Sequence, residues 1–204
     1  RNLSELYVWQ QQNPNTSVLL KEQFEIPGRI FNVLNQFCYG GRLSTRNRGR
    51  GHISFIDSSS QNPKNTGRVS SPINQVHAEI VIDSLRDILS KGSVLPNSVG
   101  VISPFNEQAK FLKNAAKENG LPKEIEFGTV HTFQGLHKSC IVLDVTAAGV
   151  DHSYRILSDE NQATALMNSA LSRCRTSGET EGRLVVIANM SHIGIQYPDS
   201  AVDR

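Results

Sequence analysis

The chain has 204 residues, of which 38% are hydrophobic and 20% are charged, so a globular domain with one sizeable core is expected. Its 21 Lys and Arg against 19 Asp and Glu give a formal net charge of +2. This balance excludes a strongly polybasic binder, and any nucleic-acid surface must come from local placement of charge. No apolar run approaches the roughly 18 residues of a membrane span, so no membrane association is expected.

The three cysteines, Cys38, Cys140 and Cys174, are widely spaced and form no CxxC pair. This pattern argues against a zinc site or a disulfide framework and predicts an intracellular, cytoplasmic protein. The start shows no signal-peptide pattern, although a chain that opens at Arg1 can be cut from something longer.

Residues 1–50 are predicted to be mostly helical, as a lead-in to the rest of the chain. Ser4 can cap a short helix to about Gln11, and Asn13-Pro14-Asn15 breaks it. In IFNVLNQFCY, apolar residues recur at three- and four-residue spacing, which predicts a second helix that ends at Gly40-Gly41. The loop RLSTRNRGRG follows, with four arginines and no acid. It is either a solvated connection or a loop that contacts phosphates, because guanidinium groups match phosphate well.

From His52 the pattern changes to an alternation of strands and helices. The expected strands are HISFID, VGVIS, IEFGTV, SCIVLDV and RLVVIAN, and the expected helices are INQVHAEIVIDSLRDIL, PFNEQAKFLKNAAKENG (with Pro104 in its first turn) and NQATALMNSALSRCR. The polar stretch up to about Pro72 is expected to be a loop, and so is AAGVDHSYRILSDENQ. The alternation predicts a single α/β domain with its core at 51–195, in which helices cover both faces of a mostly parallel sheet. Ligands of such sheets bind beyond the carboxyl ends of the strands.

A phosphate-cradling loop of the form GxxxxGK[ST] is absent. A chain of this kind therefore either does something other than hydrolyse a nucleotide or is the half without the cradle. Five segments in order choose between these possibilities: QFEIP with FCYGGRL, FID with NQVHA, SPFNEQ, TVHTFQGLHKS and NSALSRCR. These segments lie between residues 23 and 175, within a resemblance that covers about residues 3 to 190. They resemble the second, RecA-like domain of superfamily 1 helicases, in the group of the nonsense-mediated-decay helicase, and this implies a three-layer RecA-like fold that lacks its own P-loop.

The resemblance implies an ATP site shared with a first RecA-like domain, which would be this chain's partner and would hold most of the Mg²⁺ coordination. Arg173 matches the family's arginine finger, which reaches the γ-phosphate across the cleft. The alternative is a surface arginine that caps a helix C-terminus. Gly135 is a candidate for close approach to the nucleotide, and His137 stands where the family has a glutamate near the nucleotide sugar.

The resemblance also implies binding of single-stranded DNA or RNA with 5′-to-3′ polarity, and the sequence does not separate the two polymers. Thr129 and Thr132 lie where a strand is expected to turn into a helix, and their hydroxyls can hold a phosphate of the strand. Ser103 and Pro104 form a similar junction, where the serine hydroxyl can meet a backbone phosphate. Both junctions have a plain structural alternative, as simple connections between elements. Gln108 is expected to orient a neighbouring loop.

Three departures from the family pattern leave the state of the ATP site open. Glu25 stands where the family has an arginine, and a carboxylate repels a γ-phosphate. His77 and His137 each stand where the family has a glutamate. Either the ATP site is degenerate, or other residues compensate: Arg29 can supply the missing cation or pair with Glu25, and a neutral imidazole at 137 can still bond a ribose hydroxyl.

Two other functions remain as alternatives to the helicase half. The fold can be retained as a binding platform for nucleic acid or protein, with catalysis lost at Glu25. An unrelated doubly wound domain that binds a small ligand is disfavoured, because no GxGxxG fingerprint is present. The remaining histidines have no metal-ligand spacing, so no metal site is expected, and Cys174 is expected to be a packing residue rather than a nucleophile.

Overall fold

The computed structural model describes residues 12, 13, 15, 20–61, 65–68, 71–146, 160–176 and 181–189. The helix predicted from Ser4 to Gln11, and most of the polar loop predicted after residue 146, lie outside the described residues.

All five strands predicted for the central sheet are present, and all of them run parallel. They are β3 (Gly51–Asp57), β6 (Val99–Ser103), β7 (Glu126–Thr129), β8 (Cys140–Asp144) and β9 (Gly182–Ala188), in the spatial order β3-β9-β8-β6-β7. The apolar run of SCIVLDV becomes β8 at the centre of the sheet, where all of its residues are buried. Only a strand that is covered on both faces can be apolar throughout.

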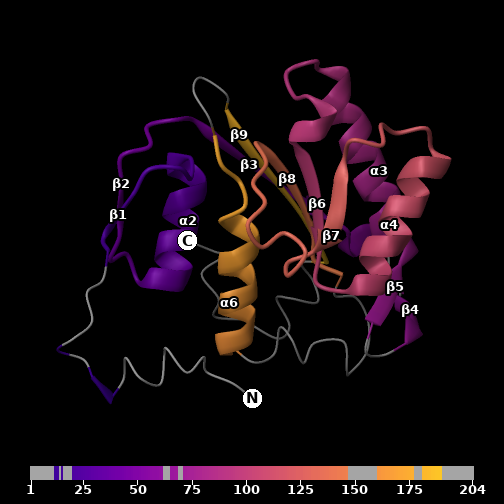
Figure 1. The fold of residues 1–204 in the computed structure, drawn as a ribbon. Coiled ribbons are helices and arrows are strands. Elements are labelled where there is room, and N and C mark those ends of the chain that lie inside the picture. Colours follow the sequence, from indigo (N-terminus) through magenta and orange to yellow (C-terminus); the bar gives the residue numbers. More distant parts are fainter. Residues whose placement is uncertain are drawn as a thin grey trace.

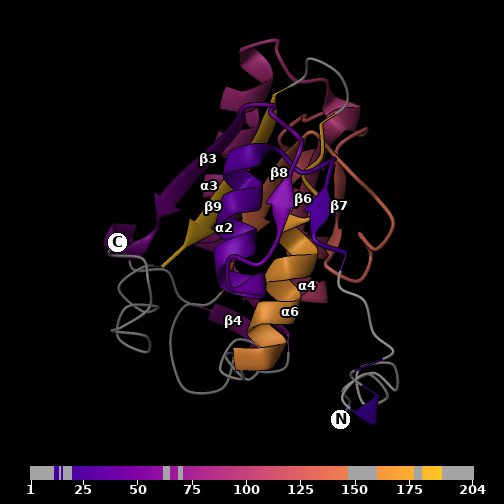
Figure 2. The same ribbon diagram turned by 90° about the vertical axis from the view of Figure 1, so that its left-hand side faces the viewer.

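Helices cover both faces of this sheet (Figures 1 and 2). On one face lie α2 (Gly28–Tyr39) and α6 (Glu160–Leu171), and on the other lie α3 (Gln75–Ser90) and α4 (Asn106–Glu118). Alternate residues of β8 serve the two cores: Ile141 and Leu143 pack on the α2 and α6 side, whereas Cys140 and Val142 pack on the α3 and α4 side. The predicted three-layer α/β architecture is therefore confirmed.

Two short pairs of strands were not expected from the sequence. Where a loop was predicted up to about Pro72, the structure has a 3₁₀ turn, η2 (Ser59–Gln61), and an antiparallel hairpin of β4 (Asn65–Arg68) and β5 (Ser71–Asn74). In the lead-in, which was predicted to be mostly helical, β1 (Glu22–Gln23) pairs in parallel with β2 (Ser44–Thr45). These segments are polar and short, so they carry no apolar period that would reveal pairing through the backbone.

Two junctions also differ from the prediction. Pro104 is not in the first turn of α4, because Phe105 is the N-cap and the helix begins at Asn106. The segment TVHTFQG does not lead into a helix: residues 130–135 form hydrogen-bonded turns. Phe133 is fully buried and anchors these turns, and Gly135 with φ +82° takes a conformation that favours glycine. Consequently no helix N-terminus is available at this junction to bind a phosphate.

Candidate functional site

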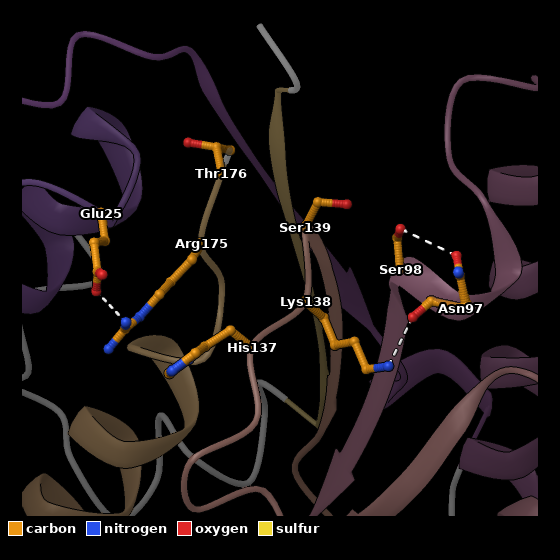
Figure 3. Close-up of a pocket in the computed structure, with 8 residues that line it drawn as sticks. All are labelled: Glu25, Asn97, Ser98, His137, Lys138, Ser139, Arg175 and Thr176. Carbon is orange, nitrogen blue, oxygen red and sulfur yellow. Dashed lines mark hydrogen bonds and ion pairs between the residues drawn. The ribbon is translucent and has the colours of Figure 1, made fainter. Parts of the chain in front are cut away.

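A polar cavity of about 400 Å³ lies at the amino ends of the central strands, not at the carboxyl ends where the sequence rule placed ligands. It is lined by residues that directly precede β6 and β8, by the segment that leads toward β9, and by a residue in front of α2 (Figure 3). These residues are Asn97, Ser98, His137, Lys138, Ser139, Arg175, Thr176 and Glu25. A cavity of this size is within the range of small-molecule sites.

Backbone hydrogen bonds tie three distant segments together around the cavity. The Lys138 amide donates to the Arg173 carbonyl at 3.0 Å, and the Arg175 amide donates to the Lys138 carbonyl at 3.0 Å. The Thr176 amide donates to the Glu25 carbonyl at 3.3 Å. The segment after α6 is thus held like an added strand between the segment before β8 and the segment before α2. This arrangement brings the predicted residues Glu25, His137 and Arg173 to one place.

Glu25 forms an ion pair with Arg175, a residue that the sequence did not single out. Arg29, the partner suggested by helical spacing, is exposed, and the partner of Glu25 in this structure is Arg175 instead. The Glu25 side chain is 59% exposed and the Arg175 side chain is 30% exposed. The Nε atom of Arg175 is buried and has no hydrogen-bond partner among the described residues. A buried donor without an acceptor is costly, and it marks a place where an anion would be stabilised.

Arg173 has its guanidinium folded back on its own turn. Its Nε donates to the Ser169 carbonyl at 2.9 Å, Nη1 to the Phe133 carbonyl at 3.5 Å and Nη2 to the Ser172 hydroxyl at 2.8 Å. In this structure it therefore caps the C-terminal end of α6, which is the structural alternative considered from the sequence. Burial, and then the charge of Arg175, lower the pKa of Arg173.

His137 is exposed at the same cavity, and its side chain points to the same side as that of Arg175 (Figure 3). Burial lowers the pKa of His137, the charges of Arg175 and Arg173 lower it further, and the carboxylate of Glu25 opposes them. The lowered pKa favours the neutral imidazole. Gly135 lies two residues earlier, and the space that a side chain would fill there is empty within 4 Å. An approaching ligand would meet only backbone at this point.

Lys138 adds a further cation to the lining, but its side chain turns toward the other end of the cavity (Figure 3). Its Nζ donates to the Asn97 carbonyl at 2.7 Å. Sequence reasoning missed both Lys138 and Arg175. The only signal for Arg175 was its place two residues after Arg173 in NSALSRCR, and for Lys138 its place directly after His137.

At the carboxyl ends of the strands, Ser103 is turned away from solvent. Its side chain is fully buried, and its hydroxyl lies 3.3 Å from the Thr146 hydroxyl. In this structure the Ser103 hydroxyl is thus turned into the core and is not presented to a phosphate. Thr129 and Thr132 do lie together, with their hydroxyls 3.2 Å apart at the end of β7, and Thr132 is exposed.

Ser103 belongs to one hydrogen-bond network at the carboxyl ends that includes every buried polar side chain among the described residues: Ser58, Asn74, His77, Ser103, Gln108, Asp144 and Thr146. At its centre His77 bonds Asp144 through Nδ1 at 2.7 Å and Ser58 through Nε2 at 2.8 Å. The side-chain amide of Gln108 holds Asn74 by two bonds: its Oε1 accepts from the Asn74 amide at 2.9 Å and its Nε2 donates to the Asn74 carbonyl at 3.2 Å, as expected of a residue that orients a neighbouring segment. Because the network is fully buried, its serine, histidine and aspartate cannot act on a substrate in solvent.

Metal-ligand clusters and membrane-spanning helices were both considered for the part of the chain that the structure describes. In that part, no group of three His, Cys, Asp or Glu residues could hold a metal ion. None of the helices described there is long and apolar enough to cross a membrane.

Three comparisons bear on this architecture. A family model described as AAA domain matches residues 2–190. A regulator of nonsense transcripts 1 homolog of Arabidopsis thaliana is 32% identical over 99 residues, which are 46% of this chain and 8% of that protein. The DNA polymerase alpha-associated DNA helicase A of Saccharomyces cerevisiae is 30% identical over 122 residues, 60% of this chain and 16% of that protein. The matches thus span only a small part of these curated relatives. A solved C-terminal domain of a possible DNA helicase from Lactobacillus plantarum WCFS1 has a TM-score of 0.49 and 12% identity, and the match covers 81% of this chain and 88% of that one.

Proposed function

Since the chain belongs to the AAA domain family and is a domain of the superfamily 1 helicase type, we propose that it is the C-terminal motor half of an ATP-dependent helicase. In this function it completes an ATP site formed with a first RecA-like domain, and it contacts single-stranded DNA or RNA. The observation that carries the proposal is that Arg175 and His137 line one polar cavity and that Arg173 lies beside it, with its carbonyl bonded to the Lys138 amide, although these residues are up to 38 positions apart in the chain.

The residues of the cavity fit the polyphosphate part of a nucleotide. Arg175 and Lys138 line it, Arg173 lies beside it, and among the described residues Glu25 is the only carboxylate in its lining. A planar guanidinium binds phosphate oxygens through paired hydrogen bonds, and the unpartnered Nε of Arg175 is a donor that an anion can satisfy. ATP bound here supplies the phosphoryl transfer that drives the motor, with Mg²⁺ held mainly by the first domain. This excess of cations favours a compensated site over a degenerate one, and hence the motor over the binding platform.

Arg173 acts as the arginine finger in this proposal, and it must leave its capping position to do so. The guanidinium has five N–H donors, of which three bond Ser169, Phe133 and Ser172. Its terminal nitrogens each keep a further N–H, so a phosphate can be contacted before the capping bonds are given up. Docking of the first domain with its nucleotide would then draw the side chain across the cleft, where a finger contributes about 10³–10⁵ in rate.

Nucleic acid is proposed to bind on the opposite side of the domain, at the carboxyl ends of the parallel strands. There the hydroxyls of Thr129 and Thr132 lie side by side at the end of β7, and a pair of hydroxyls can donate to one phosphate of a strand. His137, at the amino edge, is proposed to hydrogen-bond the nucleotide ribose as a neutral imidazole. The nucleotide and the single-stranded nucleic acid would thus bind at opposite ends of the parallel strands. Movement of this domain could then couple nucleotide hydrolysis to movement along the nucleic acid.

The test is steady-state ATP hydrolysis by a polypeptide that carries this chain together with its first RecA-like domain. Arg173→Ala is expected to lower kcat by at least about 10³ with little change in KM, because a finger acts on the transition state. Arg86→Ala is the matched control, since Arg86 is an exposed arginine on α3 that also makes an ion pair and a side-chain hydrogen bond. If both variants retain the wild-type kcat, Arg173 is only a helix cap and the proposed function fails.

A further inference from the structure

Among the described residues, the Glu25–Arg175 pair is the one place where a carboxylate contacts a cation of the cavity lining (Figure 3). We propose that Arg175 is a second phosphate-binding arginine, and that Glu25 occupies its guanidinium as an internal substitute for phosphate until a polyphosphate displaces it. The inference rests on the proposed function, since it names a further residue of that nucleotide site and a carboxylate that competes with the ligand.

The first argument is that the pair is held from the backbone side and not by the carboxylate itself. The Glu25 carbonyl accepts from the Thr176 amide at 3.3 Å and from Asn47 Nδ2 at 2.9 Å, and the Glu25 amide donates to Gln23 Oε1 at 2.9 Å. These bonds fix the start of the Glu25 side chain beside Arg175 whether or not the carboxylate is engaged. The carboxylate can therefore swing into solvent without disturbing the walls of the cavity.

The second argument is that the carboxylate satisfies Arg175 incompletely. Glu25 engages Nη1, but the buried Nε of the same guanidinium has no partner among the described residues. A tetrahedral phosphate offers several oxygens and can bond the Nε and Nη edge of an arginine in a bidentate manner. The geometry thus favours exchange of a singly bonded carboxylate for a doubly bonded phosphate.

The third argument concerns charge and exposure. Arg175 lowers the pKa values of both His137 and Arg173, so three basic side chains lie within electrostatic reach of one another. A single carboxylate leaves this group with an excess of positive charge, and a polyphosphate would remove it. Because the Glu25 side chain is 59% exposed, its ion pair is screened by solvent and stabilises the fold little, so its displacement is cheap.

The test measures the affinity of the 204-residue chain for inorganic triphosphate by isothermal titration calorimetry at low salt. Glu25→Gln removes the competing charge and keeps the side-chain shape, so the dissociation constant is expected to fall by about tenfold, equivalent to about 1.4 kcal/mol. In the Arg175→Ala background the same substitution is expected to change it by no more than about twofold, because the carboxylate then has no guanidinium to withhold.

Glu22→Gln is the matched control. Glu22 lies three residues before Glu25 and forms an ion pair with Arg46 at 2.8 Å, but it does not line the cavity. Its substitution is expected to change the dissociation constant by less than about twofold. In a parallel NMR titration, triphosphate is expected to shift the Arg175 Nε–H resonance of the wild-type chain, which a purely structural role would not predict.

Three outcomes overturn the proposal. The first is a Glu25→Gln variant that binds triphosphate no tighter than wild type, and the second is an equal gain in the Arg175→Ala background or in Glu22→Gln, which would indicate general surface charge. The third is no binding of triphosphate by wild type or Glu25→Gln, which would also remove the nucleotide site. Triphosphate binding that follows the expected pattern, in a polypeptide without ATP hydrolysis, would retain the role of Arg175 and reject only the motor.

Discussion

Replacing His77 by alanine should destabilise the fold far more than loss of two ordinary hydrogen bonds would suggest. His77 and Asp144 are both fully buried and 2.7 Å apart, and the histidine also bonds Ser58 at 2.8 Å. His77→Ala leaves a buried carboxyl oxygen of Asp144 and the buried Ser58 hydroxyl without that partner, and each buried polar group left unsatisfied costs about 1–3 kcal/mol. Asp144 would keep its bonds from Gln108 and Thr146, so we expect about 3 kcal/mol, a large share of the usual 5–15 kcal/mol of a domain.

Urea unfolding of the 204-residue chain, followed by circular dichroism at 25 °C, measures this loss. With a slope of about 2–3 kcal/mol per molar urea, the midpoint of His77→Ala should fall by about 1 M. His52→Ala is the matched control, because His52 bonds Glu181 at 2.8 Å on the surface, where both side chains are about half exposed. Its free energy of unfolding should change by no more than about 0.5 kcal/mol.

A double-mutant cycle then identifies the source of the loss. In an Asp144→Asn background no buried carboxylate is left without its partner, so His77→Ala should cost only about 1–2 kcal/mol, as a lost hydrogen bond and a small cavity. The reasoning is refuted if the free energy of unfolding of His77→Ala lies within about 1 kcal/mol of the wild-type value. It is also refuted if the substitution lowers the free energy of unfolding equally in the wild-type and Asp144→Asn backgrounds. The first result would mean that the two buried hydrogen bonds of His77 contribute little to stability, and the second that the bond to Asp144 does not account for the loss.

Three further predictions follow from the described residues. Burial raises the pKa of Cys140 and of Cys174 to about 12, so iodoacetamide at pH 8.5 should leave both thiols unmodified in the native chain and alkylate both in urea. Mass spectrometry measures the labelling, and rapid alkylation of the native chain would contradict the burial of the two thiols. A Cβ at Gly100 would lie 2.6 Å from the Phe133 ring, so Gly100→Ala should lower the free energy of unfolding by about 1–3 kcal/mol, and an unchanged urea midpoint would disprove the close approach. Burial and the neighbouring arginines lower the pKa of His137, and a bound anion would raise it; sulfate should therefore bind more tightly as the pH falls from about 8 to 6, and this dependence should disappear in His137→Asn.

The sequence was sufficient for the sheet and its covering helices, because their apolar periods are long and unambiguous. The strand SCIVLDV could be assigned to the centre of a parallel sheet, and β8 lies there. The short β1–β2 and β4–β5 pairs could not be predicted, since their stability comes from backbone bonds between polar segments and not from a side-chain pattern. For TVHTFQG, the family motif identified the segment but not its local form, which the buried Phe133 and the left-handed Gly135 determine.

The candidate site was predictable in part for a similar reason. Motif order pointed to Glu25, His137 and Arg173, and the structure brings all three to one cavity or its edge. The partner predicted for Glu25 was wrong. Helical spacing suggested Arg29, but Glu25 pairs with Arg175, which lies 150 residues away in the sequence. Contacts of that kind depend on the register of strands, which no local pattern reveals.

The role of His77 could not be predicted from the sequence for the same reason. The sequence showed it only as a lost glutamate, but its partner Asp144 is 67 residues away and reaches it from the end of β8. Ser103 shows a further limit of the sequence: the residue type does not reveal which way a side chain at a strand end points, and here it points into the network.

The central claim is that this chain is a working half of a nucleotide-driven motor. The most direct measurement is ATP hydrolysis by the polypeptide that carries the chain with its first RecA-like domain, with and without single-stranded DNA or RNA. The account predicts turnover that rises when single-stranded nucleic acid is added, because the cations at the amino ends and the hydroxyls at the carboxyl ends flank the strands of the same sheet. Absence of turnover with either polymer, in a polypeptide whose first domain binds ATP, would contradict it and would favour a helicase fold retained for binding.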